Sequence, residues 1–139
     1  MILLDTNIIS EIMKEFPSES VTTWLSQQHS LTLYVSSISI AEVRYGLNIM
    51  PESKKRSRLE SSFTSVMQSA FSQRVLVFDE NAAIQYATLM SKNKKTGSVM
   101  TTFDAQIASI AISTRSLLAT RNTKDFVRCG IQIINPFES

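Results

Sequence analysis

Five short, strand-like apolar runs alternate along this chain with longer segments of helical periodicity. The runs are residues 2–4, 31–35, 75–78, 116–120 and 131–134, and the helix-like segments are 6–13, 18–28, 36–46, 51–71, 80–91 and 104–113. Strands that alternate with helices pair in parallel, and the helices then cover both faces of the sheet. Only three glycines and three prolines occur, too few for the many tight turns of an all-β sandwich. The sequence therefore predicts an α/β fold with a central parallel sheet of five strands.

Length and composition predict one domain over residues 1–139, with enough apolar residues for a core. No apolar run approaches the roughly 18 residues that a membrane span requires, so we expect no membrane association. Met1 leads directly into the first strand, with no basic leader, and we expect a cytoplasmic protein. The single cysteine, Cys129, excludes an intrachain disulfide and a cysteine-rich zinc site.

Four acidic residues stand near the ends of these strands. Asp5 directly follows the first strand, Glu42 lies about one turn into the helix after the second, Asp104 begins the helix before the fourth, and Asp125 comes five residues after the fourth. In a parallel sheet all four can meet at the carboxyl edge, where open α/β sheets bind ligands. Simpler alternatives remain open, because Asp5 and Asp104 can act as helix caps and Glu42 can be an exposed helix residue.

Other acids of the chain have local explanations. Asp79, after the third strand, is better explained as a helix cap. Thr6 or Asn7 is expected to cap the first helix, and Glu11 is expected on its exposed face.

Several kinds of site chemistry are excluded. Neither G-x-x-x-x-G-K-[ST] nor G-x-G-x-x-G is present, so no Gly-rich loop cradles a phosphate. The lone His29 and lone Cys129 lie far apart, which rules out a His-rich metal site and argues against a His-based triad. Carboxylates and a hard cation remain, and oxygen ligands select Mg²⁺ or Mn²⁺. Crowded carboxylates repel each other unless such a cation neutralises them.

Basic residues cluster although the net charge is only +2. One cluster contains Lys54, Lys55, Arg56 and Arg58, and a second contains Lys92, Lys94 and Lys95. Either cluster can contact a phosphate backbone or can be a solvated helix face.

Taken in order, several segments resemble the PIN-domain ribonucleases, in particular the VapC and FitB-like toxins of bacterial toxin–antitoxin modules. The segments are MILLDTNIISE, SSISIAEVRYG, FDAQIASIA, LATRNTKDF and the terminal INPF. Each is weak alone, but the ordered set is specific and spans essentially the whole chain.

This resemblance implies a PIN-like α/β/α sandwich and an endoribonuclease that depends on Mg²⁺ or Mn²⁺. It implies that Asp5, Glu42 and Asp104 are the core acids, with Asp5 and Asp104 as the direct metal ligands. Asp125 is the favoured fourth acid, although some relatives have their acid at the position of Asn122.

The resemblance also implies roles for neutral polar residues. Asn122 and Thr120 are expected to assist the acids. Asn7 is expected to orient Asp5 or a water molecule.

The resemblance further implies an RNA substrate, a cognate antitoxin protein and a homodimer. The basic segment with Lys54, Lys55 and Arg56 is expected to guide RNA, together with Arg44 and Arg121. Arg44 has the alternative role of a structural partner for a carboxylate. Two alternative functions stay open, a catalytically silent PIN-like module that binds RNA or a regulator, and a metal-dependent DNA nuclease.

Overall fold

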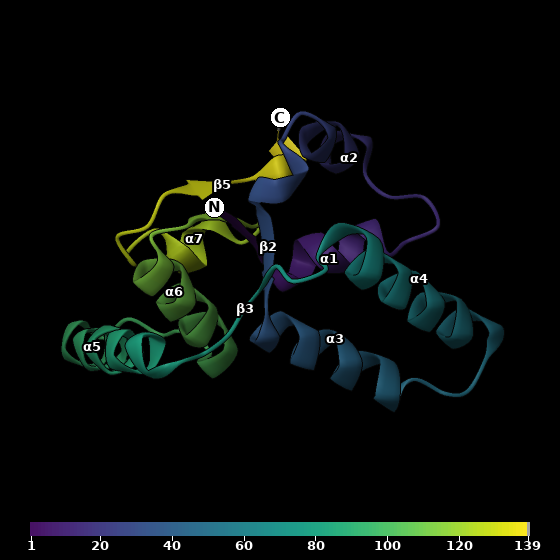
Figure 1. The fold of residues 1–139 in the computed structure, drawn as a ribbon. Helices are drawn as coiled ribbons and strands as arrows, with labels where there is room; N and C mark the ends of the chain where they lie inside the picture. Colours follow the sequence, from purple (N-terminus) through teal and green to yellow (C-terminus); the bar gives the residue numbers. More distant parts are fainter. Residues whose placement is uncertain (139) are drawn as a thin grey trace.

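The computed structural model describes residues 1–138. In it a parallel sheet lies between two layers of helices (Figure 1). Its strands are β1 (Ile2–Leu4), β2 (Leu33–Ser36), β3 (Val75–Leu76), β4 (Leu117–Ala119) and β5 (Ile133–Ile134). Its helices are α1 (Thr6–Ile12), α2 (Glu19–Ser26), α3 (Ser37–Ile49), α4 (Lys54–Ala70), α5 (Glu80–Thr96), α6 (Thr102–Thr114) and α7 (Thr123–Phe126), with short 3₁₀ helices η1 (Ser30–Thr32) and η2 (Pro136–Glu138). The predicted α/β/α sandwich with five parallel strands is confirmed.

Strand β1 lies at the centre of the sheet, in the order β3-β2-β1-β4-β5. Its residue Leu3 pairs with Tyr34 of β2 on one side and with Leu118 of β4 on the other. The chain fills one half of the sheet first and then crosses to the other half, so the strand order reverses between β1 and β4. Ligand sites of open α/β sheets lie at such a switch point, outside the carboxyl ends of the strands. Asp5 and Thr120 come directly after these two strands.

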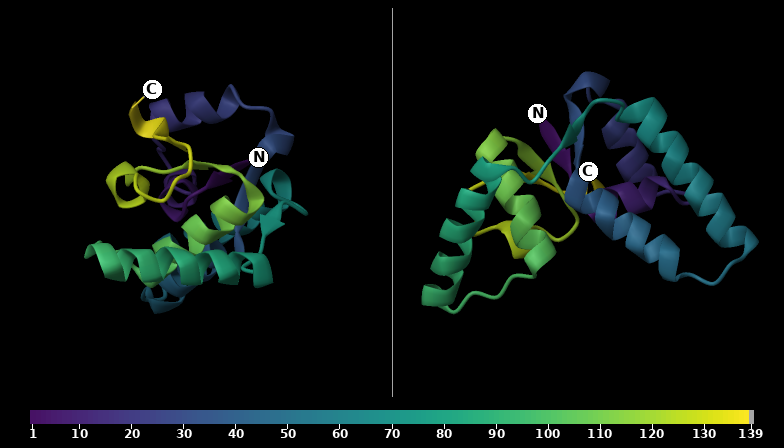
Figure 2. Two further views of the ribbon diagram at one scale, coloured as in Figure 1. Left: turned by 90° about the vertical axis from the view of Figure 1, so that its left-hand side faces the viewer. Right: turned by 60° about the horizontal axis from the view of Figure 1, so that its bottom comes forward.

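The alternation of side chains along β1 separates two apolar cores. Leu4 faces the core formed with α1 to α4, where Ile8, Val43 and Phe63 are buried. Leu3 faces the opposite core, which α5, α6 and α7 cover. The helix pairs α3–α4 and α5–α6 diverge on one side of the sheet, as the right-hand view of Figure 2 shows. Within residues 1–138, no helix is both long enough and apolar enough to cross a membrane.

Side-chain caps determine where the main helices begin. Asp5, and not Thr6 or Asn7 as predicted, is the N-cap of α1, and its Oδ1 accepts from the Thr6 N–H. The predicted cap at Asp79 is confirmed, since its Oδ1 accepts from the Ala82 N–H. Such caps satisfy N–H groups that have no partner within the helix.

Several element boundaries differ from the prediction. Helix α3 continues past Gly46 to Ile49, because Leu47 is buried in the core beyond the glycine. Helix α5 ends only at Gly97, whose φ of 75° allows the left-handed cap. The four-residue helix α7 was not predicted, because it is too short to show a helical period.

Phe126 anchors α7 to the second core and is fully buried. We expect Phe126→Ala to lower the free energy of unfolding by about 3–5 kcal/mol, because it removes a large buried side chain and leaves a cavity. Phe16 is 86 % exposed, so Phe16→Ala is the matched control and should change stability by less than about 0.5 kcal/mol. Urea unfolding of both variants measures the difference, and equal effects would contradict the assigned burial.

Candidate active site

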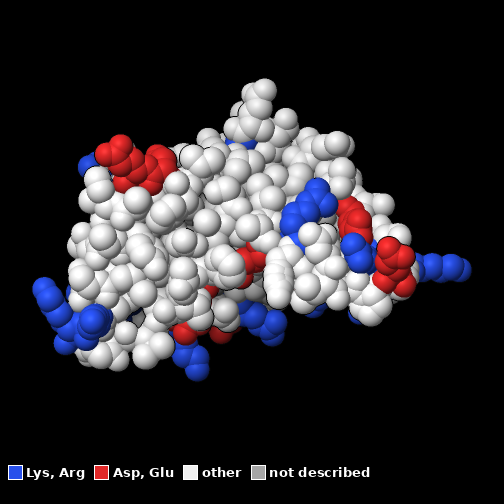
Figure 3. Space-filling view, turned by 90° about the horizontal axis from the view of Figure 1, so that it is seen from below, with Lys and Arg blue, Asp and Glu red and all other residues white. Residues whose placement is uncertain are grey.

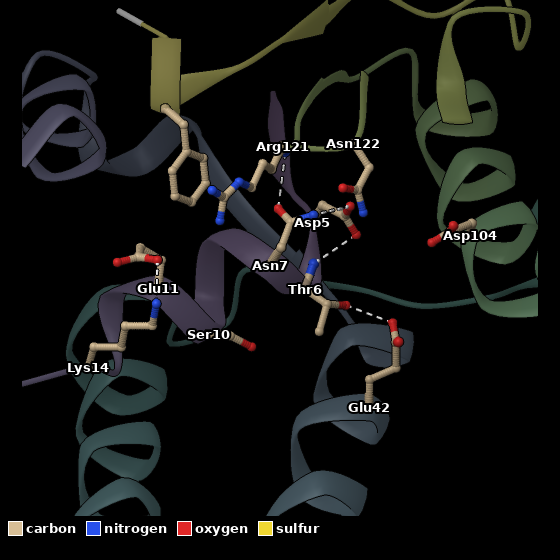
Figure 4. A pocket seen from close by; sticks show the side chains of 11 residues that line it. Asp5, Thr6, Asn7, Ser10, Glu11, Lys14, Glu42, Asp104, Arg121 and Asn122 are labelled. Atoms are coloured by element: carbon tan, nitrogen blue, oxygen red, sulfur yellow. Dashed lines mark hydrogen bonds and ion pairs between the residues drawn. The ribbon is translucent and has the colours of Figure 1, made fainter. Parts of the chain in front are cut away.

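A cavity of about 410 Å³ opens at the carboxyl ends of β1 and β4 (Figure 4). It is lined by Asp5, Thr6, Asn7, Ser10, Glu11, Lys14, Glu42, Asp104, Arg121, Asn122 and Phe137. The three predicted core acids, Asp5, Glu42 and Asp104, therefore share one cavity, although they come from β1, α3 and α6. Figure 4 shows the three carboxylates as the corners of a triangle, with Asp104 to the right of Asp5 and Glu42 below it.

Asp5 is held in place by a set of hydrogen bonds. It is 3 % exposed. Its Oδ1 accepts from the Thr6 N–H at 2.8 Å, and its Oδ2 accepts from the Thr120 hydroxyl at 2.7 Å and from the Asn7 Nδ2 at 3.2 Å. Burial raises the pKa of Asp5 from 3.8 to about 6, and the charges of Asp104 and Glu42 act in the same direction. The predicted orienting role of Asn7 is thus matched by a direct contact, and Thr120 makes a shorter one.

Glu42 reaches the cavity from the first turns of α3. Its Oε1 accepts from the Thr6 hydroxyl at 2.7 Å, and that hydroxyl oxygen lies 2.8 Å from the Ser39 Oγ. Burial raises the pKa of Glu42, and the Asp104 charge adds to this rise. Thr6 therefore connects the cap of α1 to the second acid.

Asp104 stands in the first turn of α6. Thr101 is the N-cap of this helix, and its hydroxyl oxygen accepts from the Asp104 N–H at 3.2 Å. Asp104 is therefore not the cap, and its carboxylate is available to the cavity. Burial raises the pKa of Asp104, and the charge of Asp125 raises it further.

No basic side chain forms an ion pair with these three acids within residues 1–138. The ion pairs there are Lys14–Glu11 at 2.9 Å and Arg56–Glu60 at 2.6 Å. As the side chains stand, no three His, Cys, Asp or Glu residues of this range lie close enough to hold a metal ion. The donor chemistry nevertheless fits a hard divalent cation, because the cavity offers oxygen ligands and uncompensated negative charge.

The two candidates for the fourth polar position of the site, Asn122 and Asp125, line different cavities. Asn122 lines the main cavity, whereas Asp125 lines an adjoining hollow. Asp125 is still close enough for its charge to raise the pKa of Asp104. Thr120 is fully buried, donates to Asp5 and accepts from the Asn122 N–H at 3.0 Å.

Glu11 was expected to be exposed, and that expectation is wrong. It is 7 % exposed and lines the cavity, with Oε1 accepting from the Lys14 Nζ and Oε2 from the Ser18 N–H at 2.9 Å. The Lys14 ammonium is the main cause of its lowered pKa. Helical spacing could have identified it, because Glu11 follows Asn7 by one turn on the same face of α1.

Of the predicted RNA-guiding residues, Arg121 lies in the cavity. Its guanidinium is 4.5 Å from the centre of the Phe137 ring, and the backbone N–H of Arg121 donates to the Asn7 Oδ1 at 3.2 Å. Figure 4 shows this side chain on the opposite side of Asp5 from Asp104.

The other basic residues lie on α3 and α4. Arg44 stacks on Phe63 at 4.9 Å and forms no ion pair with a carboxylate within residues 1–138. Arg56 is paired with Glu60, while Lys54 and Lys55 are exposed. Figure 3 shows the molecule from below the view of Figure 1. Acidic atoms occupy the recessed middle of this face, and lysines and arginines gather on either side of it.

Comparisons with known proteins agree with this geometry. Residues 2–131 match the family model described as the PIN domain. The chain is 41 % identical to a VapC ribonuclease of Sinorhizobium fredii, with 99 % of both chains covered, and 35 % identical to the toxin FitB of Neisseria gonorrhoeae, again with 99 % of both. The crystal structure of FitAcB from Neisseria gonorrhoeae contains a chain that superposes with a TM-score of 0.90 at 34 % identity, with both chains fully covered.

The raised pKa of Asp5 has a consequence for stability. Between pH 4 and 6 the folded protein binds this proton more strongly than the unfolded chain does. The contribution of protonated Asp5 to the free energy of unfolding is therefore fully present below about pH 4, and it is lost as the pH rises through about 6. At neutral pH the rise of the pKa from 3.8 to about 6 lowers the free energy of unfolding by at most about 3 kcal/mol.

We therefore expect Asp5→Asn to raise the free energy of unfolding at pH 7.5 in EDTA by about 1–2 kcal/mol, because weakened hydrogen bonds offset part of the gain. At pH 4 the gain should vanish. Urea unfolding at both pH values measures it. A variant that is less stable than the wild type at pH 7.5 would contradict the raised pKa.

Proposed function

Because the chain belongs to the PIN-domain family, among relatives of the VapC and FitB type, we propose that it is the ribonuclease toxin of a toxin–antitoxin pair. The proposed reaction is hydrolysis of RNA phosphodiester bonds with Mg²⁺ or Mn²⁺. The observation that carries this proposal is the convergence of Asp5, Glu42 and Asp104, which share one cavity without a basic partner.

Asp5 and Asp104 would hold the cation directly, and Glu42 would contact it through water. When bound, such a cation neutralises carboxylate charge, polarises a phosphate and makes water more acidic. Thr120 and Asn7 keep the Asp5 carboxylate in one orientation through their hydrogen bonds. Asp125 would serve as the fourth acid, with Asn122 as a polar contact of the substrate or of water.

Water attacks the phosphorus, the bond to the 3′ oxygen breaks, and the leaving oxygen takes up a proton, giving a 3′-hydroxyl and a 5′-phosphate. Glu42 is suited to accept the proton of the attacking water, because its pKa is raised and the Thr6 hydroxyl holds its carboxylate. Arg121 faces the cavity with its guanidinium fixed against Phe137, where it would contact the phosphate. Lys54, Lys55, Arg56 and Arg44 would act at a greater distance, by attracting the RNA backbone.

An antitoxin would occupy the groove between α1, α3 and α4. This groove of about 490 Å³ has apolar side chains in its wall, namely Met13, Val43, Leu47, Met50 and Leu59, and the basic residues Lys14, Lys55 and Arg58 line it as well. It also includes Glu42, which lines the acidic cavity as well. A partner segment with apolar anchors and one basic side chain could therefore fill the groove and neutralise the acids together.

A homodimer is proposed on the family resemblance. Large apolar side chains that a second copy could cover are exposed on α3, where Ile49 is 69 % and Tyr45 58 % exposed.

Activity measurements separate this enzyme from a catalytically silent RNA-binding module and from a DNA nuclease. We expect the wild type to cleave RNA but not DNA of the same sequence, to stop in EDTA and to recover with Mn²⁺. Asp5→Asn should lower the cleavage rate at least 10³-fold, because it removes a charged ligand. Asp79→Asn is the matched control, since that acid caps α5 outside the cavity, and it should stay active.

A fully active Asp5→Asn enzyme would rule out this assignment of the site. A wild type that binds RNA but never cleaves it with either metal would favour the silent module.

The fourth position can be tested by comparing Asp125→Asn with Asn122→Ala. If Asp125 is the fourth acid, its neutralisation should raise the Mn²⁺ concentration for half-maximal activity several-fold, because negative charge is removed near Asp104. Asn122→Ala should change this concentration little and act mainly on KM for RNA. The reverse pattern would assign the fourth position to Asn122.

A further inference from the structure

A second hollow, of about 340 Å³, shares no lining residue with the acidic cavity or with the apolar groove. It is formed by the end of α5, the connection to α6, and α7 with the residues after it. Its walls include Asn93, Ser98, Val99, Lys124, Val127 and Arg128. None of these residues has a role in the proposed reaction.

This hollow adjoins the acidic cavity. Asp125, in its wall, lies three residues after Asn122, which lines the cavity. The residues of α7 connect the two spaces, since Asn122 before it faces the cavity and Lys124 within it faces the hollow.

The cations of the hollow are available for an anion. Lys124 and Arg128 are exposed, and neither forms an ion pair within residues 1–138. Arg128 donates one N–H to the Ser98 hydroxyl at 3.4 Å, and the other guanidinium donors form no hydrogen bond within residues 1–138. Asp125 is the acid among the lining residues, so positive charge predominates there.

Aliphatic side chains at the rim indicate a ligand larger than a free anion. Val99 is 97 % exposed and Val127 is 65 % exposed, and both line the hollow. A nucleotide presents a phosphate, which the basic side chains can contact, together with a sugar and a base, against which the aliphatic side chains can pack.

We propose that this hollow binds a nucleotide of single-stranded RNA that flanks the cleaved bond, with Lys124 and Arg128 contacting its phosphate. This proposal rests on the proposed ribonuclease function and adds a substrate subsite to it. The strand would pass from Arg121 across the acids to α7, so that the cleaved phosphate lies between two basic contacts.

The test uses the variant Lys124→Gln/Arg128→Gln in the full chain. Binding of a fluorescein-labelled single-stranded RNA is followed by anisotropy over a series of KCl concentrations, in the Asp5→Asn background so that no cleavage occurs. We expect Kd to rise several-fold and the slope of log K against log salt to become shallower by about 0.7, because the contact with one phosphate of the single strand is lost. In the cleaving protein, KM should rise while kcat stays nearly constant.

Lys94→Gln/Lys95→Gln is the charge-matched control. It removes the same charge from exposed residues of α5 that do not line the hollow. This control should change the slope much less, and Arg128→Lys should retain most of the affinity.

Equal slopes for the two double variants would overturn the proposal. So would a loss of affinity for the cognate antitoxin with RNA binding unchanged, which would assign the hollow to a protein partner. Failure of the proposed function is distinguishable, because the wild type would then not cleave RNA while the difference in binding between the double variants persisted.

Discussion

The pairing of β1 with β4 is the constraint on which the site depends. It brings residue 5 next to residue 120, where the Asp5 N–H donates to the Ala119 carbonyl at 2.9 Å and the Thr120 hydroxyl donates to Asp5 at 2.7 Å. The sheet changes direction between these strands, so the helices that carry Glu42 and Asp104 approach Asp5 from two sides. A shift of register between β1 and β4 would move the Thr120 hydroxyl away from Asp5 and break this contact.

The same arrangement makes the site electrostatically costly. Asp5 is nearly inaccessible to water and close to two other acids, and its pKa is raised to about 6. Elsewhere the chain pairs another buried acid, Glu11, with Lys14, yet it leaves these three without a basic partner within residues 1–138. A carboxylate cluster that reduces stability without a cation, and gains stability with one, is expected of a site selected for metal chemistry.

Much of this could be predicted from the sequence, because strand-end acids and apolar periodicity are local signals. The parallel sheet followed from them, and so did the expectation that four acids meet at its edge, of which Asp5, Glu42 and Asp104 share the cavity and Asp125 does not line it. Features that depend on tertiary contacts could not be predicted from such local signals. Glu11 is buried because α2 and Lys14 supply its partners, and α7 forms because Phe126 packs in the core.

Calorimetric titration of the purified chain with Mn²⁺ at pH 7.5 tests the central claim most directly. If the three acids form one cation site, the wild type should show saturable binding that is lost in both Asp5→Asn and Asp104→Asn and kept in Asp79→Asn. Binding that is unchanged in Asp5→Asn and Asp104→Asn, or absent from the wild type, would contradict it.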